Sequence, residues 1–493
     1  MLAEVEDQVS STPGRVYIET YGCQQNVNDS EIVLGILQAH GHQHCAVLEE
    51  ADVVLLNTCS IREQAEDRVW QRLHTIEHTF KKRREHDRAS VKPIVAVLGC
   101  MAERLKSRLL EDKKLVDVVA GPDAYRDLPF LINSRKVSGM SSMNVQLSLD
   151  ETYADIAPVR IGGSGVSAFV SIQRGCNNMC SFCVVPFTRG RERSRPVSSI
   201  LDEVRVLVDH GYKEVTLLGQ NVNSYADRSV PADSHSPRKT SAGFTPIWKE
   251  RFEGALRFAD LLDAVARAAP DMRIRFTSPH PQWFPDELLH VIAAHANICN
   301  ALHLPAQSGS SSVLHRMRRG YTREAYDDLL ARARALIPGL FVSTDLIAGF
   351  CGETDEEHQQ TVDLVQRSSF DKAFMFHYSL REKTHAHRHY QDDVPSDVKL
   401  ARLNEIIRSF QVSLDAKLQQ YIGTEHTLLV HGRSEKDPAL LHGLTDGGRL
   451  VVFPQPGHVQ AGQYVRVRVT GRKGSLVGEA LESINEVAER AFV

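Results

Sequence analysis

Short apolar runs alternate with helical stretches through the first 120 residues. The β-branched apolar runs that predict strands are 16–20, 52–57, 93–99 and 116–121. Helical patterns that lie between them are near 29–40, 62–87 and 102–111. Alternation of this kind is typical of a parallel sheet with helices on its faces. Residues 134–165 are rich in Ser, Gly and Met without periodicity, so they predict a linker.

A second strand–helix series follows. The predicted strands are 168–173, 214–219, 273–278, 301–306, 341–349 and 373–379. The predicted helices are near 198–210, 257–269, 285–296, 322–336 and 355–368. Six strands with intervening helices favour an open, partial version of the (β/α) barrel. Residues 226–253, rich in Pro, Ser and mixed charge, interrupt the series and predict an insertion loop.

The pattern changes after a long amphipathic helix near 396–420. Short strands with Gly-rich turns are predicted at 426–432, 449–454, 463–470 and 475–482. They indicate a small antiparallel β-barrel. The predicted α/β chain therefore has an N-terminal domain over 1–150, a partial barrel over 151–395, a connecting helix over 396–419 and a C-terminal barrel over 420–486.

Composition narrows the class of protein. Of the 493 residues, 42% are hydrophobic and 24% charged, which is ordinary for a globular protein. No run approaches the ~20 apolar residues of a membrane helix, so no membrane partner is expected. The formal net charge is −4, so any contact with nucleic acid must come from a local basic patch. The acidic opening, with Glu4, Glu6 and Asp7, resembles neither a signal peptide nor a transit peptide.

Three cysteines follow the first strand of the second series as C-x3-C-x2-C. They are Cys176, Cys180 and Cys183, in "RGCNNMCSFC". Three thiolates suit a 4Fe–4S cluster, because they leave one iron open for an external ligand. Zinc is the alternative, but a structural zinc site needs four ligands, and no second cysteine pair follows. A cluster is therefore the favoured interpretation.

A second set of cysteines is dispersed along the N-terminal domain. Cys23, Cys59 and Cys100 each come directly after an apolar strand. Because the carboxyl ends of parallel strands meet at one edge of a sheet, the three thiols are expected to lie close together. The remaining cysteines, Cys45, Cys299 and Cys351, lack such a setting and are interpreted as spectators. With nine cysteines in all, an intracellular protein with metal-binding or reactive thiols is favoured over a disulfide scaffold.

With these motifs the chain resembles the radical SAM methylthiotransferases, and within them the tRNA branch that forms 2-methylthio-N6-isopentenyladenosine. The resemblance rests on "ETYGCQQNVNDSE", "LLNTCSIREQAE", "LGCMAERL", "VSIQRGCNNMCSFCVVPFTRGRERSRP", "VTLLGQNVNSY", "LPAQSGSSSVLHRMRRGYTREAY" and "STDLIAGFCGET". It implies two 4Fe–4S clusters, one on each cysteine set, with S-adenosylmethionine bound at the cluster of Cys176, Cys180 and Cys183. Carbon C2 of adenine offers no proton that a base can usefully remove, so radical chemistry from a cofactor is required.

The resemblance also implies cofactor contacts. Phe182 is expected against the adenine of S-adenosylmethionine. Strand-end residues expected to bind the rest of that cofactor are Gly219, Gln220, Asn221, Gln307, Ser308, Gly309 and Gly349. The alternative is that these residues are ordinary core and turn positions. "HAHRHY", with His385, His387 and His389, resembles a metal tract but is more simply a variable connection.

Arginines supply the expected RNA contacts, because guanidinium groups match phosphate bidentately. One set, Arg189, Arg191, Arg193 and Arg195, recurs at every second position of "FTRGRERSR", and "HRMRRG" adds Arg316, Arg318 and Arg319. In the C-terminal barrel, which resembles the TRAM module, alternation places Arg466 and Arg468 on one strand face, with Arg472 and Lys473 beyond them. The expected partner is the tRNA anticodon arm, modified at position 37. A solvated cationic surface is the alternative.

Other functions stay open at this stage. Related branches act on threonylcarbamoyladenosine in tRNA or on a ribosomal protein, and a non-catalytic regulatory scaffold with the same fold is a different class. "LLGQNVNSY" favours the isopentenyladenosine branch, and the presence of all six cysteines argues against a scaffold. A reduced flavodoxin or ferredoxin is the expected electron donor, and the sulfur donor is undetermined. The resemblance suggests a mitochondrial location, with a cytoplasmic one as the alternative.

Overall fold

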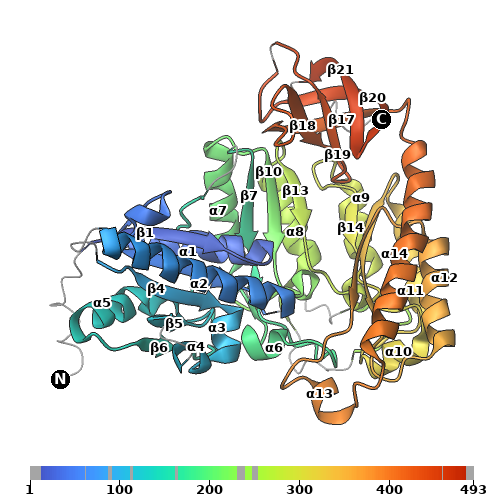
Figure 1. Ribbon diagram of the computed structural model, residues 1–493. Helices are drawn as coiled ribbons and strands as arrows, with labels where there is room; N and C mark the ends of the chain where they lie inside the picture. Colours follow the sequence, from blue (N-terminus) through green and yellow to red (C-terminus); the bar gives the residue numbers. More distant parts are fainter. Residues whose placement is uncertain are drawn as a thin grey trace. The chain divides into compact units, whose positions relative to one another are not determined.

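The structure is a computed structural model that describes residues 13–60, 63–86, 91–111, 115–161, 165–229, 239–246, 254–457 and 459–484 (Figure 1). Its residues group into two compact units. The first comprises Met1–Ile161, Arg174–Cys176 and Val184–Arg193, and the second comprises Gly162–Gln173, Asn177–Cys183 and Ser194–Val493. Among the described residues, no helix is long and apolar enough to cross a bilayer.

The first unit is built on a six-stranded parallel sheet in the order β2-β1-β3-β4-β5-β6. Its strands are β1 (Arg15–Thr20), β2 (Gln43–His44), β3 (Val53–Thr58), β4 (Ile94–Gly99), β5 (Val118–Ala120) and β6 (Ser142–Asn144). Its helices are α1 (Gln24–Ala39), α2 (Glu63–His86), α3 (Cys100–Leu105), α4 (Arg108–Glu111) and α5 (Leu128–Ser138). The predicted strand–helix alternation is confirmed.

Alternate side chains of the strands supply two hydrophobic cores, one on each face of this sheet. Leu55 packs with α1 and α5, whereas its neighbour Leu56 packs with α2, α3 and α4. All six residues of β3 are buried, as expected for a central parallel strand covered on both faces. The cysteines that follow such strands are therefore held on a rigid frame.

The predicted linker over 134–165 is wrong for its described part. This segment contains the end of α5 and the strand β6, which pairs with β5 in the sheet. Beyond β6, the Tyr153 hydroxyl donates to the Pro122 carbonyl at 2.9 Å, and Arg160 pairs with Glu31 at 2.7 Å. The segment lacks apolar periodicity because it is held by polar contacts with residues distant in sequence.

The second unit contains six parallel strands in two sheets, β13-β10-β7 and β14-β15-β16. These strands are β7 (Ser167–Ser171), β10 (Glu214–Leu218), β13 (Arg273–Phe276), β14 (Ala301–His303), β15 (Phe341–Ala348) and β16 (Lys372–His377). A parallel bridge between Ile274 and Ile298 connects the two sheets. One hydrophobic core runs behind both, so the predicted partial barrel is confirmed.

Helices cover the outer side of these strands (Figure 1). The helices between residues 185 and 419 are α6 (Val185–Thr188), α7 (Val197–Asp209), α8 (Phe258–Ala268), α9 (Asp286–Ala294), α10 (Ser311–Arg316), α11 (Arg323–Leu336), α12 (Asp355–Ser368), α13 (His385–His389) and α14 (Ser396–Gln419). The short strands are β8 (Gln173–Arg174), β9 (Arg193–Ser194), β11 (Ala226–Asp227) and β12 (Leu256–Arg257). The predicted insertion loop falls partly outside the described residues; within it, buried Phe244 packs on Tyr321 with ring centroids 4.8 Å apart.

The C-terminal strands close into the predicted small barrel, in the order β17-β18-β19-β21-β20. Sequence reasoning missed β18, and β19 pairs with β21 in parallel rather than antiparallel. They are β17 (Glu425–Arg433), β18 (Leu440–Leu444), β19 (Leu450–Pro454), β20 (Tyr464–Lys473) and β21 (Ser475–Ile484). Arg273 and Arg275 on β13 donate to the carbonyl groups of Leu444 and Asp446, at 2.8 and 2.7 Å. This barrel is therefore anchored on β13 by buried Arg273 and half-buried Arg275.

Glu214 on β10 completes this anchor, and its ionisation makes the anchor sensitive to acid. Burial acts to raise the pKa of Glu214, but Arg275 at 2.7 Å and His431 outweigh burial and lower the pKa from 4.5 to about 2. Because folding lowers the pKa of Glu214, the ionised carboxylate stabilises the folded protein fully at pH values above the ordinary pKa of 4.5. This stabilisation is lost as the pH falls toward the folded-state pKa of about 2.

We therefore expect Glu214→Gln to melt at a lower temperature than wild type at pH 6. The difference between the two melting temperatures should shrink steadily as the pH is lowered to 3. Differential scanning calorimetry across that range measures it. Glu287, an exposed partner of Lys239, supplies the matched control Glu287→Gln. A difference between wild type and Glu214→Gln that does not change with pH would contradict the assignment.

Candidate functional site: two cysteine sets

Cys23, Cys59 and Cys100 follow β1, β3 and β4, which are neighbours in the sheet. Cys23 precedes α1 and is exposed, Cys59 follows β3 directly, and Cys100 is the first residue of α3. Cys59 and Cys100 are only 6% and 7% exposed. The structure thus brings the dispersed thiols to one sheet edge, as the sequence pattern predicts.

Two glycines keep the backbone close to these thiols. A side-chain carbon at Gly22 would lie 2.5 Å from Cβ of Cys59, and one at Gly99 would lie 2.6 Å from the Thr58 carbonyl oxygen. Both glycines have positive φ, 117° and 86°, which other residues rarely adopt. Among the described residues, no three Cys, His, Asp or Glu side chains converge on a single metal ion. In a cubane 4Fe–4S cluster, each thiolate binds a different iron, so the sulfur atoms do not need to converge on one point. Three separated thiols at one sheet edge therefore fit a cluster.

Arg189 is buried beside this set, so its position does not support the predicted RNA contact. Its Nε donates to Sγ of Cys100 at 3.1 Å, while Nη1 and Nη2 donate to Asp29 at 2.5 Å and Asn26 at 2.7 Å. Arg174 pairs with the other oxygen of Asp29 at 2.9 Å. Burial acts to raise the pKa of Asp29, but the two guanidinium groups outweigh it and hold the pKa below its usual value.

The second cysteine set lies in the loop after β8. Cys176 and Cys180 are buried and Cys183 is half-buried. Gly175 has a φ of 72°, and a side-chain carbon there would lie 2.1 Å from the Arg191 carbonyl oxygen. The Ser181 amide donates to the Met317 carbonyl at 3.0 Å, and the Cys183 amide to that of Cys180 at 3.0 Å. Backbone hydrogen bonds therefore shape this loop.

Arg319 is buried beside Cys180, so its position does not support the predicted RNA contact either. Its Nη1 donates to Sγ of Cys180 at 3.3 Å. The other nitrogens donate to the Tyr321 hydroxyl and the Pro305 carbonyl, both at 3.0 Å. The ion pairs of the described residues include no carboxylate partner for Arg319. A buried cation of this kind requires an anion, and a thiolate-bound cluster supplies one.

The residues expected to bind S-adenosylmethionine divide into two groups. In the first, Gly219 and Asn221 follow β10, and half-buried Gln220 lies between them. A side-chain carbon at Gly219 would lie 2.7 Å from Oε1 of Gln173. That oxygen and Oδ1 of Asn221 are buried and accept no hydrogen bond from any described residue. Because ammonium groups donate hydrogen bonds, this strand end fits the amino group of the cofactor.

Phe182 also belongs to the first group, because it is only partly buried. It packs beside a cluster that includes Phe350 and Tyr378. An aromatic face at this place is compatible with an adenine ring, and its assignment stays a prediction.

The second group packs inside the protein. Ser308 and Gly309 contact α12, where the Gly309 amide donates to Thr361 Oγ1 at 2.9 Å and a side-chain carbon at Gly309 would lie 2.2 Å from the Gln360 carbonyl oxygen. A side-chain carbon at Gly349 would lie 2.3 Å from Cγ of Lys399 on α14. Gln307 adopts a φ of 71° and pairs through its backbone with β15. These contacts explain the residue types through packing, so none of them supports the predicted cofactor contact.

The remaining arginines of "FTRGRERSR" divide between buried and exposed. Arg193 pairs with Asp123 at 2.7 Å and Arg195 with Glu203 at 2.7 Å, and both arginines are buried. These positions do not support their predicted RNA contacts, because their guanidinium groups already pair with carboxylates. Arg191 is exposed, and its RNA contact stays a prediction. In "HRMRRG", Arg316 pairs with Glu357 at 2.6 Å, whereas Arg318 is half-buried.

On the C-terminal barrel, Arg466 and Arg468 share the outer face of β20 while Val465, Val467 and Val469 are buried. The predicted alternation is confirmed. Arg468 pairs with Glu425 at 2.6 Å, and Arg472 pairs with Asp415. The face is thus a mixture of basic and acidic groups, and its RNA contact stays a prediction.

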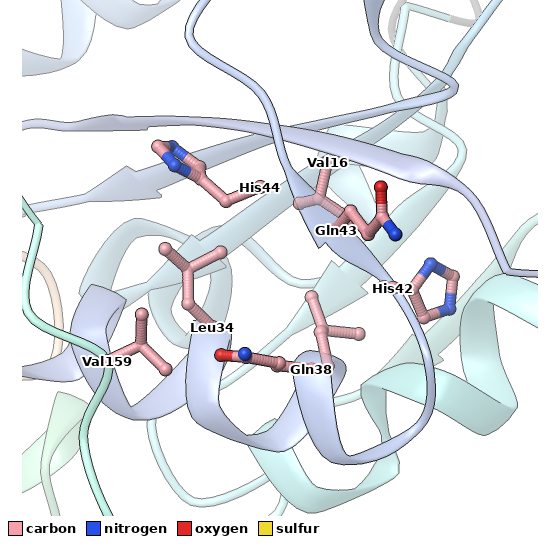
Figure 2. Close-up of a pocket in the computed structure, with 8 residues that line it drawn as sticks. Val16, Leu34, Gln38, His42, Gln43, His44 and Val159 are labelled. Carbon is pink, nitrogen blue, oxygen red and sulfur yellow. The ribbon is translucent and has the colours of Figure 1, made fainter.

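Other candidates carry no site chemistry. Cys45, Cys299 and Cys351 are buried, in agreement with the spectator interpretation. The rings of His385 and His389 on α13 lie 4.3 Å apart, tilted by 32°, and no metal-binding group forms among the described residues. Figure 2 shows a pocket beside α1, lined by His42, His44 and Val159 among others. Its volume of about 20 Å³ holds roughly one water molecule, too little for an adenosine.

Asp29, Asn26 and Arg174 were missed by sequence reasoning. One signal for them exists in α1. An amphipathic helix buries apolar residues, but the first turns of α1 bury the polar residues Asn26, Asn28, Asp29 and Ser30. Buried polar side chains of this kind must have partners. Arg174 in "VSIQRGC" pairs with Asp29 in "NVNDSE". These two segments are distant in sequence, so only the fold identifies the pair.

Comparison with known proteins defines the class first. Residues 170–365 match the radical SAM superfamily, residues 15–121 match a family described as uncharacterized protein family UPF0004, and residues 419–481 match the TRAM domain. A radical SAM methyltransferase, TsrM from Kitasatospora setae, superposes with a TM-score of 0.50 at 16% identity, covering 74% of this chain and 75% of that one. The chain therefore has the fold of a radical SAM enzyme.

Relatives then define the family. The chain is 51% identical to the mitochondrial tRNA methylthiotransferase CDK5RAP1 of Homo sapiens, over 94% of this chain and 81% of the human protein. It is 46% identical to the tRNA-2-methylthio-N(6)-dimethylallyladenosine synthase of Porphyromonas gingivalis, over 95% of each chain. The chain belongs to the radical SAM tRNA methylthiotransferases, as its motifs predict.

Proposed function

We propose that this protein converts N6-isopentenyladenosine at position 37 of tRNA to its 2-methylthio derivative, with S-adenosylmethionine and two 4Fe–4S clusters. The observation that carries the proposal is the pair of three-cysteine sets. Each lies where strands end, and in each a buried arginine donates to one sulfur. Relatives that share about half of the sequence are named for this reaction or for tRNA methylthiolation.

The chain's own residues have separate roles in this proposal. Cys176, Cys180 and Cys183 hold one cluster, and Cys23, Cys59 and Cys100 hold the other. When bound, the clusters and S-adenosylmethionine supply radical formation and the sulfur to be inserted. Oδ1 of Asn221 and Oε1 of Gln173 would accept from the cofactor's amino group, and Phe182 would lie against its adenine.

The test is direct. Protein reconstituted anaerobically with iron and sulfide is incubated with S-adenosylmethionine, a chemical reductant and isopentenylated tRNA, and the nucleosides are then analysed by mass spectrometry. We expect 2-methylthio-N6-isopentenyladenosine to form. A tRNA that carries threonylcarbamoyladenosine is the matched competitor. Modification of the competitor alone would overturn the assignment of the branch.

Partners and location follow the relatives. The electron donor is proposed to be a reduced flavodoxin or ferredoxin, because a low-potential electron is needed for cluster reduction. The location is proposed to be mitochondrial, on the strength of mammalian relatives named as mitochondrial proteins.

We expect the barrel face of β20 to contribute to tRNA binding. Changing Arg466 and Arg468 together to Glu should weaken tRNA affinity about tenfold or more and reduce its dependence on salt, because fewer counterions are then released from the phosphates. Iron content and cleavage of S-adenosylmethionine should not change. Filter binding at several salt concentrations measures the effect.

Exposed Lys372, far from this barrel in sequence, supplies the matched control Lys372→Glu. An affinity of the arginine variant that equals that of wild type would show that the β20 face is only solvated.

A further inference from the structure

Each cysteine set is accompanied by one buried arginine, and the two arginines differ in their counter-ions. Arg189 and Arg319 are 3% and 4% exposed, and each donates to a ligand sulfur. The carboxylate of Asp29 lies 2.5 Å from Arg189. Among the described residues, the partners of Arg319 besides Cys180 are neutral, namely a hydroxyl and a carbonyl oxygen. The cation beside Cys180 is therefore the less compensated of the two.

The remaining contacts hold both guanidinium groups in place. Nη2 of Arg319 and the hydroxyl of Tyr321 both donate to the Pro305 carbonyl, at 3.0 and 3.1 Å. The Arg319 guanidinium also lies over the Tyr321 ring, 5.4 Å from its centroid. The nitrogens of Arg189 that do not face sulfur bind Asp29 and Asn26. Each N–H that faces sulfur is thus oriented before a cluster binds.

We propose that Arg319 and Arg189 are positioning residues that raise the reduction potentials of the two clusters, with the larger effect from Arg319. The proposal rests on the cysteine assignment given under Proposed function. Three thiolates outweigh the positive charge of the iron–sulfur core, so the added electron makes a negative group more negative. A buried cation and an N–H bond to sulfur both stabilise that reduced form.

The asymmetry between the two arginines follows from charge. Asp29 pairs with both Arg189 and Arg174, and Glu151 lies 3.8 Å from Arg174, so two carboxylates offset the two positive charges. The main effect of Arg189 is therefore its hydrogen bond to Cys100. Arg319 contributes both its hydrogen bond and an uncompensated charge. The cluster next to Arg319 is the one assigned to S-adenosylmethionine cleavage, and in the proposed function it accepts one electron from a flavodoxin or ferredoxin. A higher reduction potential makes that electron transfer more favourable.

The test is a redox titration followed by electron paramagnetic resonance on the full chain with one cluster at a time. Cys23, Cys59 and Cys100 changed to Ala leave the cluster next to Arg319; Cys176, Cys180 and Cys183 changed to Ala leave the cluster next to Arg189. In the first background we expect Arg319→Met to shift the midpoint potential to a more negative value and Arg319→Lys to shift it less. Arg189→Met should produce a smaller negative shift in the second background.

Crossed and neighbouring variants are the controls. Arg319→Met in the second background, and Arg189→Met in the first, should leave the potential unchanged. Arg318→Met and Arg191→Met, which alter the adjacent loop positions, should also have no effect. An unchanged potential for Arg319→Met beside its own cluster, or equal shifts of both clusters, would overturn the inference.

A second measurement does not depend on the variants folding. In the unmutated protein, selective labelling of arginine with ¹⁵N should change a weak nitrogen coupling in the pulsed spectrum of each reduced cluster. Absence of any arginine coupling would also overturn the inference. Failure of a triple-cysteine background to retain iron would instead contradict the cysteine assignment, so the two failures are distinguishable.

Discussion

Replacing Cys23, Cys59 and Cys100 together by Ala is expected to abolish methylthio insertion while reductive cleavage of S-adenosylmethionine continues. The reason is that these thiols follow the ends of β1, β3 and β4, whereas Cys176, Cys180 and Cys183 lie on a separate loop. Iron should fall from about eight to about four per chain. Iron analysis, 5′-deoxyadenosine assays and nucleoside mass spectrometry measure the three quantities.

Cys45→Ala is the matched control, because Cys45 is a buried thiol of the same unit outside the cysteine set. It should retain all the iron and both activities. Loss of cleavage in the triple variant, with the cluster of Cys176, Cys180 and Cys183 intact by spectroscopy, would refute the division of labour. Loss of all iron would refute the independence of the two sites.

The second large effect is expected at Asp29. Asp29→Asn leaves Arg174 and Arg189 buried without the carboxylate that binds both, and breaking a buried pair in this way costs about 3–5 kcal/mol. The melting temperature of the first unit should fall by roughly 10 °C. Calorimetry of the protein without iron measures this effect separately from cluster loss.

The matched control is Asp202→Asn. Asp202 and its partner Arg205 are both exposed, with 71% and 59% of their side chains accessible. Exposed pairs contribute about 0–1 kcal/mol, so this variant should melt within about 2 °C of wild type. An Asp29→Asn variant that is as stable as Asp202→Asn would show that the buried arginines are satisfied by other groups.

The strand–helix order, the partial barrel and the C-terminal barrel could be predicted because they depend on local periodicity. In β20, alternation alone places Arg466 and Arg468 outward and the valines inward. The meeting of Cys23, Cys59 and Cys100 was also predictable, since parallel strands share one carboxyl edge. The structure adds that β1, β3 and β4 are immediate neighbours in that sheet.

The arginines show where sequence reasoning fails. Arg189, Arg191, Arg193 and Arg195 recur at every second position, yet Arg191 alone is exposed, because the other three pair with the carboxylates of Asp29, Asp123 and Glu203. Alternation distinguishes two faces only along a strand, and the strand β9 covers just Arg193–Ser194 of this segment. The segment over 134–165 was misjudged for a related reason, since polar contacts rather than apolar periodicity hold it.

The sequence by itself determined the chemistry, because thiolates at these spacings and strand ends define which groups can hold iron and sulfur. Only the tertiary structure decided the surroundings of those thiolates. Asp29 lies 160 residues from Arg189 in the chain, and Cys180 lies 139 residues from Arg319. No local pattern encodes such pairings. They arise because burial makes an unpaired charge costly, so the folded chain brings each buried cation to an anion.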